Sequence, residues 1–126
     1  MDSPSHTVLV VDDDAAIRFL CRVNLELEGW AVREAATIAG AREELAGGDV
    51  DVVLLDVHLG VESGTAFLGE LRRLHPGLPV LLLTGSVGTP ALDATAADGV
   101  IAKPFTLEEL LGPVRKLAPR ATSEAG

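Results

Sequence analysis

The chain has few of the residues on which several protein classes depend. Its 126 residues include one cysteine, no tyrosine and 3% aromatic residues. Cys21 cannot form an internal disulfide, and its helical spacing from Ile17 and Leu25 predicts a small buried residue, not a nucleophile. The apolar runs of four or five residues are too short to span a bilayer. The polar first residues lack the pattern of a signal peptide, so we expect a cytoplasmic protein without membrane association.

Positive charge is also scarce. Ten Lys and Arg residues stand against 19 Asp and Glu residues, which gives a formal net charge of −9. Such a chain repels phosphate backbones, so we predict no direct binding of nucleic acid. Only two of the cations are lysines. One of them, Lys103, is therefore a candidate for a role that needs a compact ammonium group.

The apolar pattern alternates between strand and helix. The predicted strands are 7–11, 30–34, 52–55, 79–83 and 99–102. The predicted helical segments, with their caps, are 15–28, 37–46, 63–76, a short piece near 91–97, and 106–118. Pro113 should kink or shorten the last helix, and Pro119 should end it. The alternation predicts an α/β fold: a doubly wound, five-stranded parallel sheet of order 2-1-3-4-5 with a shortened fourth helix.

Polar residues stand where four of the strands end. After strands one, three, four and five they are Asp12 with Asp13, Asp56, Thr84 and Lys103. In open parallel sheets, ligands bind outside the carboxyl ends of the strands, where the strand order reverses. We therefore expect the three carboxylates to share one pocket.

Carboxylates that share a pocket repel one another. Two like charges about 4 Å apart cost about 4 kcal/mol at an effective dielectric constant of 20, so the pocket takes up protons or binds a cation. Mg²⁺ accepts one or two carboxylates and keeps positions for water and substrate oxygens, as phosphoryl transfer requires. Asp56 is then the candidate nucleophile, a carboxylate that forms an acyl phosphate. Lys103 and Thr84 could contact the phosphoryl oxygens.

Each residue also has an ordinary structural interpretation. Asp13 or Asp14 can cap the helix that follows. Thr84 can close a turn, and Lys103 can extend into solvent. Their joint occurrence at four strand ends favours a shared site.

The same stretches carry the motifs of a known family. From Thr7 to Ala118 the chain resembles the receiver domain of two-component response regulators, in Val10-Val11-Asp12-Asp13, Leu54-Leu55-Asp56, Leu83-Thr84-Gly85 and Ala102-Lys103-Pro104-Phe105. The resemblance divides the chain into an extension (1–6), a receiver domain (7–118), and a tail or start of a linker (119–126). Met1 lies close to the first predicted strand, which favours a stand-alone regulator or phosphorelay shuttle over the end of a hybrid kinase.

The resemblance also implies the metal site. Asp13, Asp56 and the backbone carbonyl of His58 would bind Mg²⁺ or Mn²⁺ directly, and Asp12 would contribute through water. Asp56 would accept the phosphoryl group from a histidine kinase, a histidine phosphotransfer protein or acetyl phosphate. The domain would catalyse only its own phosphorylation and slow dephosphorylation, so it would not be an enzyme in the usual sense.

The remaining implied contacts involve the other strand ends. Thr84 and Lys103 would contact the phosphoryl group, and the bond before Pro104 is prone to the cis form. The downstream target or effector domain stays open.

Four features depart from the family pattern. Gly60 replaces the usual proline, which predicts a more mobile loop. Val100 stands where the family has an aromatic switch residue, so ring rotation there is excluded. The segment between Thr84 and Lys103 is about one helical turn short, which puts dimerisation through the fourth helix in doubt.

The fourth departure is His58, two residues after Asp56. With Ser86 it occupies positions that flank the incoming water in relatives. We hypothesise that His58 modulates dephosphorylation, with a pH dependence from its titration. A loop histidine pointing into solvent is the alternative.

Three other functions fit parts of the pattern. A haloacid-dehalogenase-like phosphatase also uses an aspartate after its first strand, but Ala16 stands where that family has Thr or Val. A flavodoxin-like cofactor binder needs a phosphate cradle, which an acidic site opposes. A degenerate receiver would act only as a docking module, although retention of all five site residues speaks against this.

Overall fold

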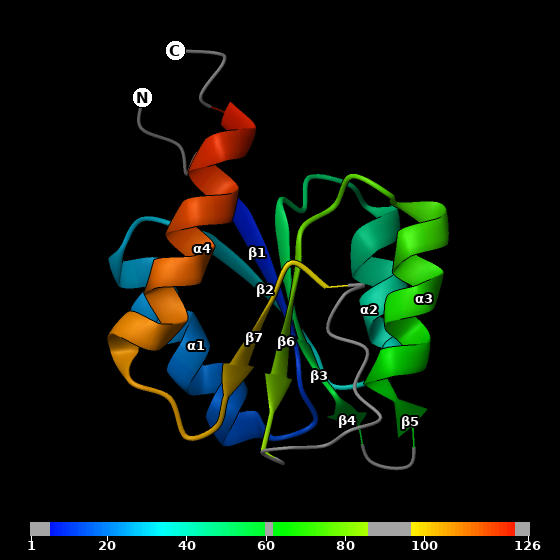
Figure 1. Cartoon of the computed structure of the whole chain (residues 1–126), viewed down its shortest axis with the longest axis horizontal. Coiled ribbons are helices and arrows are strands. Elements are labelled where there is room, and N and C mark those ends of the chain that lie inside the picture. The colour runs from blue at the N-terminus through cyan, green and yellow to red at the C-terminus, as the bar shows by residue number, and fades with distance from the viewer. Residues whose placement is uncertain (1–5, 60–61, 86–96, 123–126) are drawn as a thin grey trace.

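The computed structural model describes residues 6–59, 62–85 and 97–122. Its main sheet has five parallel strands in the order β2-β1-β3-β6-β7, which confirms the predicted order (Figure 1). The strands are β1 (Thr7–Val11), β2 (Ala31–Ala35), β3 (Val52–Asp56), β6 (Val80–Thr84) and β7 (Gly99–Ala102). The predicted short helix near 91–97 lies, apart from its last residue, outside the described residues.

Within the described ranges, four helices cover the two faces of the sheet. They are α1 (Ala15–Leu27), α2 (Ile38–Ala46), α3 (Gly64–Leu74) and α4 (Leu107–Thr122). Figure 1 shows α1 and α4 on one face and α2 and α3 on the other. None of the helices in the described ranges is long and apolar enough to cross a membrane.

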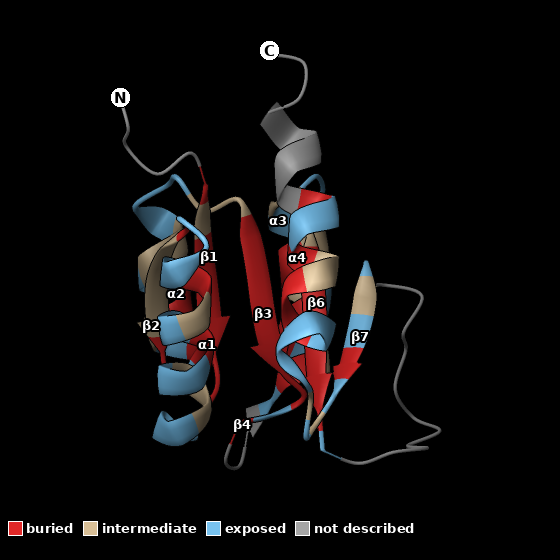
Figure 2. Cartoon of the chain, turned by 90° about the vertical axis from the view of Figure 1, so that its left-hand side faces the viewer, coloured by how far each residue is buried: buried red, intermediate tan, exposed pale blue. Residues whose placement is uncertain are grey.

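The central strands are buried throughout their length. Every residue of β3 and β6 is buried, as the red strands of Figure 2 show. Strands buried on both faces consist of continuous apolar runs, because helices cover both sides of the sheet. The edge strand β2 is mostly half-buried, in agreement with its mixed polarity.

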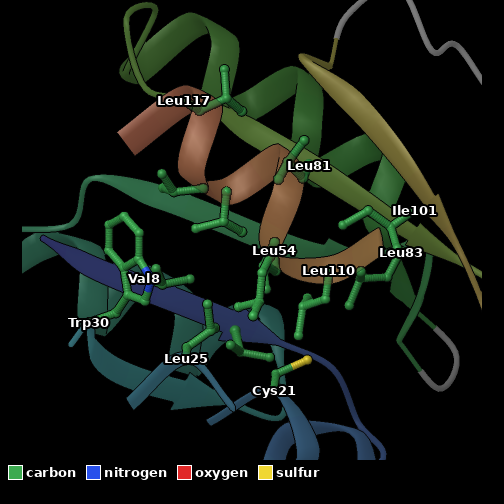
Figure 3. Close-up of a cluster of buried hydrophobic side chains, with 14 residues drawn as sticks. Val8, Cys21, Leu25, Trp30, Leu54, Leu81, Leu83, Ile101, Leu110 and Leu117 are labelled. Carbon is green, nitrogen blue, oxygen red and sulfur yellow. The ribbon is translucent and has the colours of Figure 1, made fainter. Parts of the chain in front are cut away.

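The core consists of two apolar layers, one on each face of the sheet. In Figure 3, Leu54 and Leu81 of the sheet meet Leu25 of α1 and Leu110 of α4. Cys21 belongs to this layer and is fully buried. Burial, followed by the charge of Asp12, raises the pKa of its thiol to about 12. The thiol therefore stays protonated, as expected for a small core residue.

The helices begin at the predicted polar residues. Asp14, Thr37 and Ser63 are the N-caps of α1, α2 and α3, each with a side-chain oxygen that accepts a backbone N–H. At α4, Thr106 and Glu109 form the reciprocal hydrogen bonds of a capping box. These contacts satisfy backbone groups that would otherwise lack partners at the helix ends.

The end of the last helix was predicted wrongly. Instead of ending at Pro119, α4 continues to Thr122, through Pro113 as well. The φ of proline is close to the helical value, so its cost is a lost hydrogen bond and a steric clash. Around Pro113, the buried face that includes Leu110 and Val114 offsets this cost.

The segment after Asp56 contains secondary structure that the sequence did not predict. It forms a short antiparallel pair, β4 (His58–Leu59) and β5 (Glu62–Ser63). Gly60, which was predicted to make this loop mobile, lies between the two strands and outside the described residues. The pair leads directly into α3, so it connects the end of β3 to the helix layer formed by α2 and α3.

Candidate metal and phosphoacceptor site

The predicted site residues lie at the ends of four neighbouring strands. Because β1, β3, β6 and β7 are parallel, their carboxyl ends lie at one edge of the sheet. Asp12, Asp56 and Thr84 are buried there, and Lys103 is half-buried. Asp13 is exposed at the mouth of the site. The fold therefore brings the carboxylates and the lysine together, as predicted.

Three carboxylates form a cluster that suits a small cation. One oxygen from each of Asp12, Asp13 and Asp56 lies within 4.8 Å of the others. Oxygens this close together could hold one small dication, either directly or through water. Hard oxygen ligands with an exposed side are what Mg²⁺ prefers. The residues present therefore fit this metal.

Lys103 bridges two of the carboxylates. Its Nζ donates to Asp12 Oδ2 at 2.7 Å and to Asp56 Oδ1 at 3.3 Å. The ammonium group therefore partly neutralises the two buried acids. The peptide bond between Lys103 and Pro104 is cis. The main-chain N–H of Lys103 donates to Thr84 O at 2.7 Å, which ties the end of β7 to the end of β6.

The environment of Asp56 makes its anion less stable than that of a free aspartate. Burial, and then the charge of Asp12, raise the pKa of its carboxyl group. The charge and hydrogen bond of Lys103, and a backbone hydrogen bond with His58, oppose this shift but do not reverse it. An Asp56 anion is therefore costly without additional positive charge, which a metal ion would supply.

Lys103 is held in its charged form. Burial alone lowers its pKa, but the hydrogen bond to Asp12 and the charges of Asp12 and Asp56 outweigh burial, so the pKa is raised. The side chain is thus a permanent cation at neutral pH. It can contact a phosphoryl oxygen as a charged donor.

The side chains described in this cluster do not include two of the predicted site residues, His58 and Ser86. His58 contributes its backbone hydrogen bond to Asp56, while the residue itself is exposed on β4. Metal binding by the His58 carbonyl and modulation of dephosphorylation by its imidazole stay predictions. Ser86 lies outside the described residues.

Two residues near the site were not recognised from the sequence. Gly64 begins α3, and a Cβ there would lie 2.0 Å from the main-chain oxygen of Asp56. Arg18, on α1, donates from Nη1 to the main-chain oxygen of Asp12 at 2.7 Å. A glycine directly after the cap Ser63 was the available signal for Gly64. Arg18 carried no comparable signal, because a single arginine in an amphipathic helix is ordinary.

Comparison with known proteins agrees with the geometry. The family model for the response regulator receiver domain matches residues 8–115. TcrX of Mycobacterium tuberculosis, described as a probable transcriptional regulatory protein, is 40% identical over 94% of this chain and 52% of its own length. The chain thus spans about half the length of this curated relative.

Two solved structures are similar over nearly their whole length. A CheY-like response regulator receiver domain from Methanospirillum hungatei has a TM-score of 0.84 and 30% identity, covering 94% of this chain and 98% of that one. The response regulator TrrA from Thermotoga maritima, solved with Mg²⁺ and BeF, has a TM-score of 0.82 and 33% identity, covering 89% of this chain and 98% of that one.

The sheet order, the acidic cluster with its lysine, and these matches define one class of protein. The chain belongs to the response regulator receiver domain family and is a receiver domain of two-component signalling. The phosphatase, the flavodoxin-like binder and the docking-only receiver are not favoured.

Proposed function

We propose that Asp56 accepts a phosphoryl group from a phosphohistidine of a histidine kinase or a histidine phosphotransfer protein. An oxygen of the Asp56 carboxylate attacks phosphorus, the bond from phosphorus to the histidine nitrogen breaks, and the donor imidazole takes up a proton. The product is an acyl phosphate on Asp56. Water later attacks this phosphorus, which releases phosphate and restores the carboxylate.

The site residues divide the work between metal and phosphoryl group. Asp13, Asp56 and the His58 carbonyl would hold Mg²⁺, with Asp12 contributing through water, and Mn²⁺ could replace it. When bound, the ion neutralises charge on the phosphoryl oxygens. Lys103 would contact one of these oxygens.

The proposal also includes a role for Thr84 and the boundaries of the receiver domain. The hydroxyl of Thr84 would contact another phosphoryl oxygen. Residues 7–118 would form the receiver domain, with 1–6 as an extension and 119–126 as a tail or the start of a linker. The domain would exchange phosphoryl groups in the cytoplasm, catalyse only its own phosphorylation and dephosphorylation, and act on a protein target or effector domain of unknown identity.

The contact of Lys103 with both buried carboxylates is the observation that carries this proposal. Its Nζ lies 2.7 Å from Asp12 and 3.3 Å from Asp56, although the lysine is far from both in sequence. Buried acids that share one lysine and lie beside an exposed third acid form a site where an anion and a dication can be bound together. A purely structural salt bridge does not require the third carboxylate.

Intact mass spectrometry tests the proposed phosphorylation. Incubation with acetyl phosphate and Mg²⁺ should add the mass of one phosphoryl group to the wild-type chain. Asp56→Asn should remove this gain, and so should chelation of the metal. The matched control is Asp49→Asn, because Asp49 is exposed and its positive φ also suits asparagine. An adduct that persists in Asp56→Asn would contradict the assignment.

A further inference from the structure

Arg18 connects the metal site to the neighbouring strand. Its side chain is only 19% exposed, and Nε donates to Glu34 Oε1 of β2 at 3.1 Å. Nη1 donates to the main-chain oxygen of Asp12 at 2.7 Å. One guanidinium group thus joins β2 to the end of β1, at the peptide that links the two acids Asp12 and Asp13.

The two acids of this peptide are held very differently. Asp12 has partners for all four of its polar groups: Ala35 O for its N–H, Arg18 for its carbonyl, and the Asp14 N–H and Lys103 for its carboxylate oxygens. For the exposed carboxylate of Asp13, the described residues provide no hydrogen bond or ion pair. Its position is therefore set by the main chain that carries it.

We propose that Arg18 is a positioning residue for the metal site, which it serves by fixing the peptide between Asp12 and Asp13. This inference rests on the metal binding stated in the proposed function. By holding the Asp12 carbonyl, Arg18 fixes the plane of the peptide whose N–H belongs to Asp13. The direction in which the Asp13 side chain leaves the main chain follows from that plane. Arg18 contacts neither the metal nor the phosphoryl group.

Glu34 holds Arg18 in place and provides a matched control. Its second carboxylate oxygen accepts from Arg22 Nη1 at 2.8 Å. Arg22 lies one helical turn after Arg18, and its side chain is 50% exposed. Among the described residues its ion pairs are with Glu34 and Glu26, so it shares Glu34 with Arg18 but does not share the hydrogen bond from Arg18 to the Asp12 carbonyl.

Charge and position predict opposite effects for the loss of Arg18. A cation near the site repels Mg²⁺, so removing its charge alone would strengthen metal binding. Removing the hydrogen bond that orients the peptide would weaken it, because outer-sphere partners of a metal site typically contribute tenfold or more to affinity. The sign of the change therefore separates the two effects.

Titration calorimetry of the full, unphosphorylated chain with MgCl₂ tests the proposal. Arg18→Met keeps the aliphatic stem and should weaken Mg²⁺ binding by about tenfold, whereas Arg22→Met should stay within about twofold of wild type. Arg18→Lys keeps the charge, but one ammonium group cannot replace the fork between the Asp12 carbonyl and Glu34, so part of the loss should remain. A melting curve of each variant without metal confirms that it is folded.

Each outcome bears on the proposal. Mg²⁺ binding by Arg18→Met at or above wild-type strength would overturn it, and so would an equal loss in Arg22→Met. If Arg18→Met does not fold, Arg18→Lys decides, and wild-type affinity in that variant would overturn the proposal. A wild-type chain that binds no Mg²⁺ would overturn this inference together with the proposed metal site. If the wild-type chain binds Mg²⁺ and Arg18→Met binds it equally well, this inference alone is overturned.

Discussion

Gly64 packs against the main chain of Asp56, the proposed phosphoacceptor, and leaves no room for a side chain at this position. A Cβ at this position would lie 2.0 Å from Asp56 O, 2.9 Å from Val57 Cα and 3.0 Å from Asp56 C. All three are main-chain atoms, so no side-chain rotation relieves the clash. Gly64 N–H also donates to Val57 O at 2.8 Å, which holds the start of α3 close to the end of β3.

The cost of Gly64→Ala follows from these distances. Separating the Cβ from Asp56 O to ordinary contact requires a main-chain shift of at least about 1.4 Å, and overpacking of this kind costs about 1–3 kcal/mol. Weakening the hydrogen bond to Val57 adds about 1 kcal/mol. We expect Gly64→Ala to lower the free energy of unfolding by about 2–4 kcal/mol, a large part of the stability of a small domain.

The same helix offers a matched control. Gly69 also lies in α3, and a Cβ there would have no heavy atom within 4 Å. Because alanine favours the helix over glycine, Gly69→Ala should raise the free energy of unfolding by about 0.5–1 kcal/mol. The same substitution, five positions apart, should therefore have opposite signs.

Urea unfolding measures both variants. Trp30 is the only tryptophan and is 9% exposed, so its fluorescence reports the loss of the core. Gly64→Ala should also slow phosphorylation of the folded protein, since the shift falls on the main chain of Asp56. If both variants unfold within about 0.5 kcal/mol of wild type, the close approach at Gly64 is wrong.

Three further predictions concern the charged site. Because burial raises the pKa of Asp56, the folded state holds its proton more tightly than the unfolded chain, and stability is lost as pH rises through that raised value. Calorimetry without Mg²⁺ should therefore show Asp56→Asn melting above wild type at neutral pH, with a gap that closes in acid; a gap independent of pH would contradict the shift. Lys103→Met should bind Mg²⁺ about tenfold more tightly, since it frees oxygens of Asp12 and Asp56 and removes a nearby cation, yet should phosphorylate more slowly. The exposed Lys116→Met is its control, and unchanged Mg²⁺ affinity in Lys103→Met would refute the competition. His58→Ala should change the lifetime of the phosphorylated chain, measured by phosphate release, and an unchanged lifetime would leave His58 an exposed residue of β4 with no role in dephosphorylation.

Much of the fold could be predicted from short apolar runs and polar caps. The runs ending at Val11 and Asp56 determine buried strands, because only strands covered on both faces are apolar throughout. Caps such as Ser63 mark helix starts, because their side chains replace missing backbone partners. The end of α4 could not be predicted from Pro119. Proline disfavours the helix interior through a lost hydrogen bond and a steric clash, but packing of other residues on the helix can offset this cost.

The site was predictable where it depends on strand ends and unpredictable where it depends on close packing. Asp12 and Lys103 each follow a strand and Asp56 ends one, so parallel pairing alone brings them to one edge. The clash that reserves position 64 for glycine and the bond from Arg18 to Asp12 depend on the distance between α3 or α1 and the sheet. Periodicity places a residue on a face of a helix, but it does not give that distance.

Chemical mapping of the phosphoryl group tests the central claim most directly. Borohydride reduces an aspartyl phosphate to homoserine, which peptide mass spectrometry locates. After incubation with acetyl phosphate and Mg²⁺, reduction should convert Asp56 alone, and without the metal it should convert no aspartate. Homoserine at Asp12 or Asp13, or equal conversion of Asp56 without a divalent cation, would contradict a site in which clustered carboxylates bind a dication and prepare Asp56 for phosphorylation.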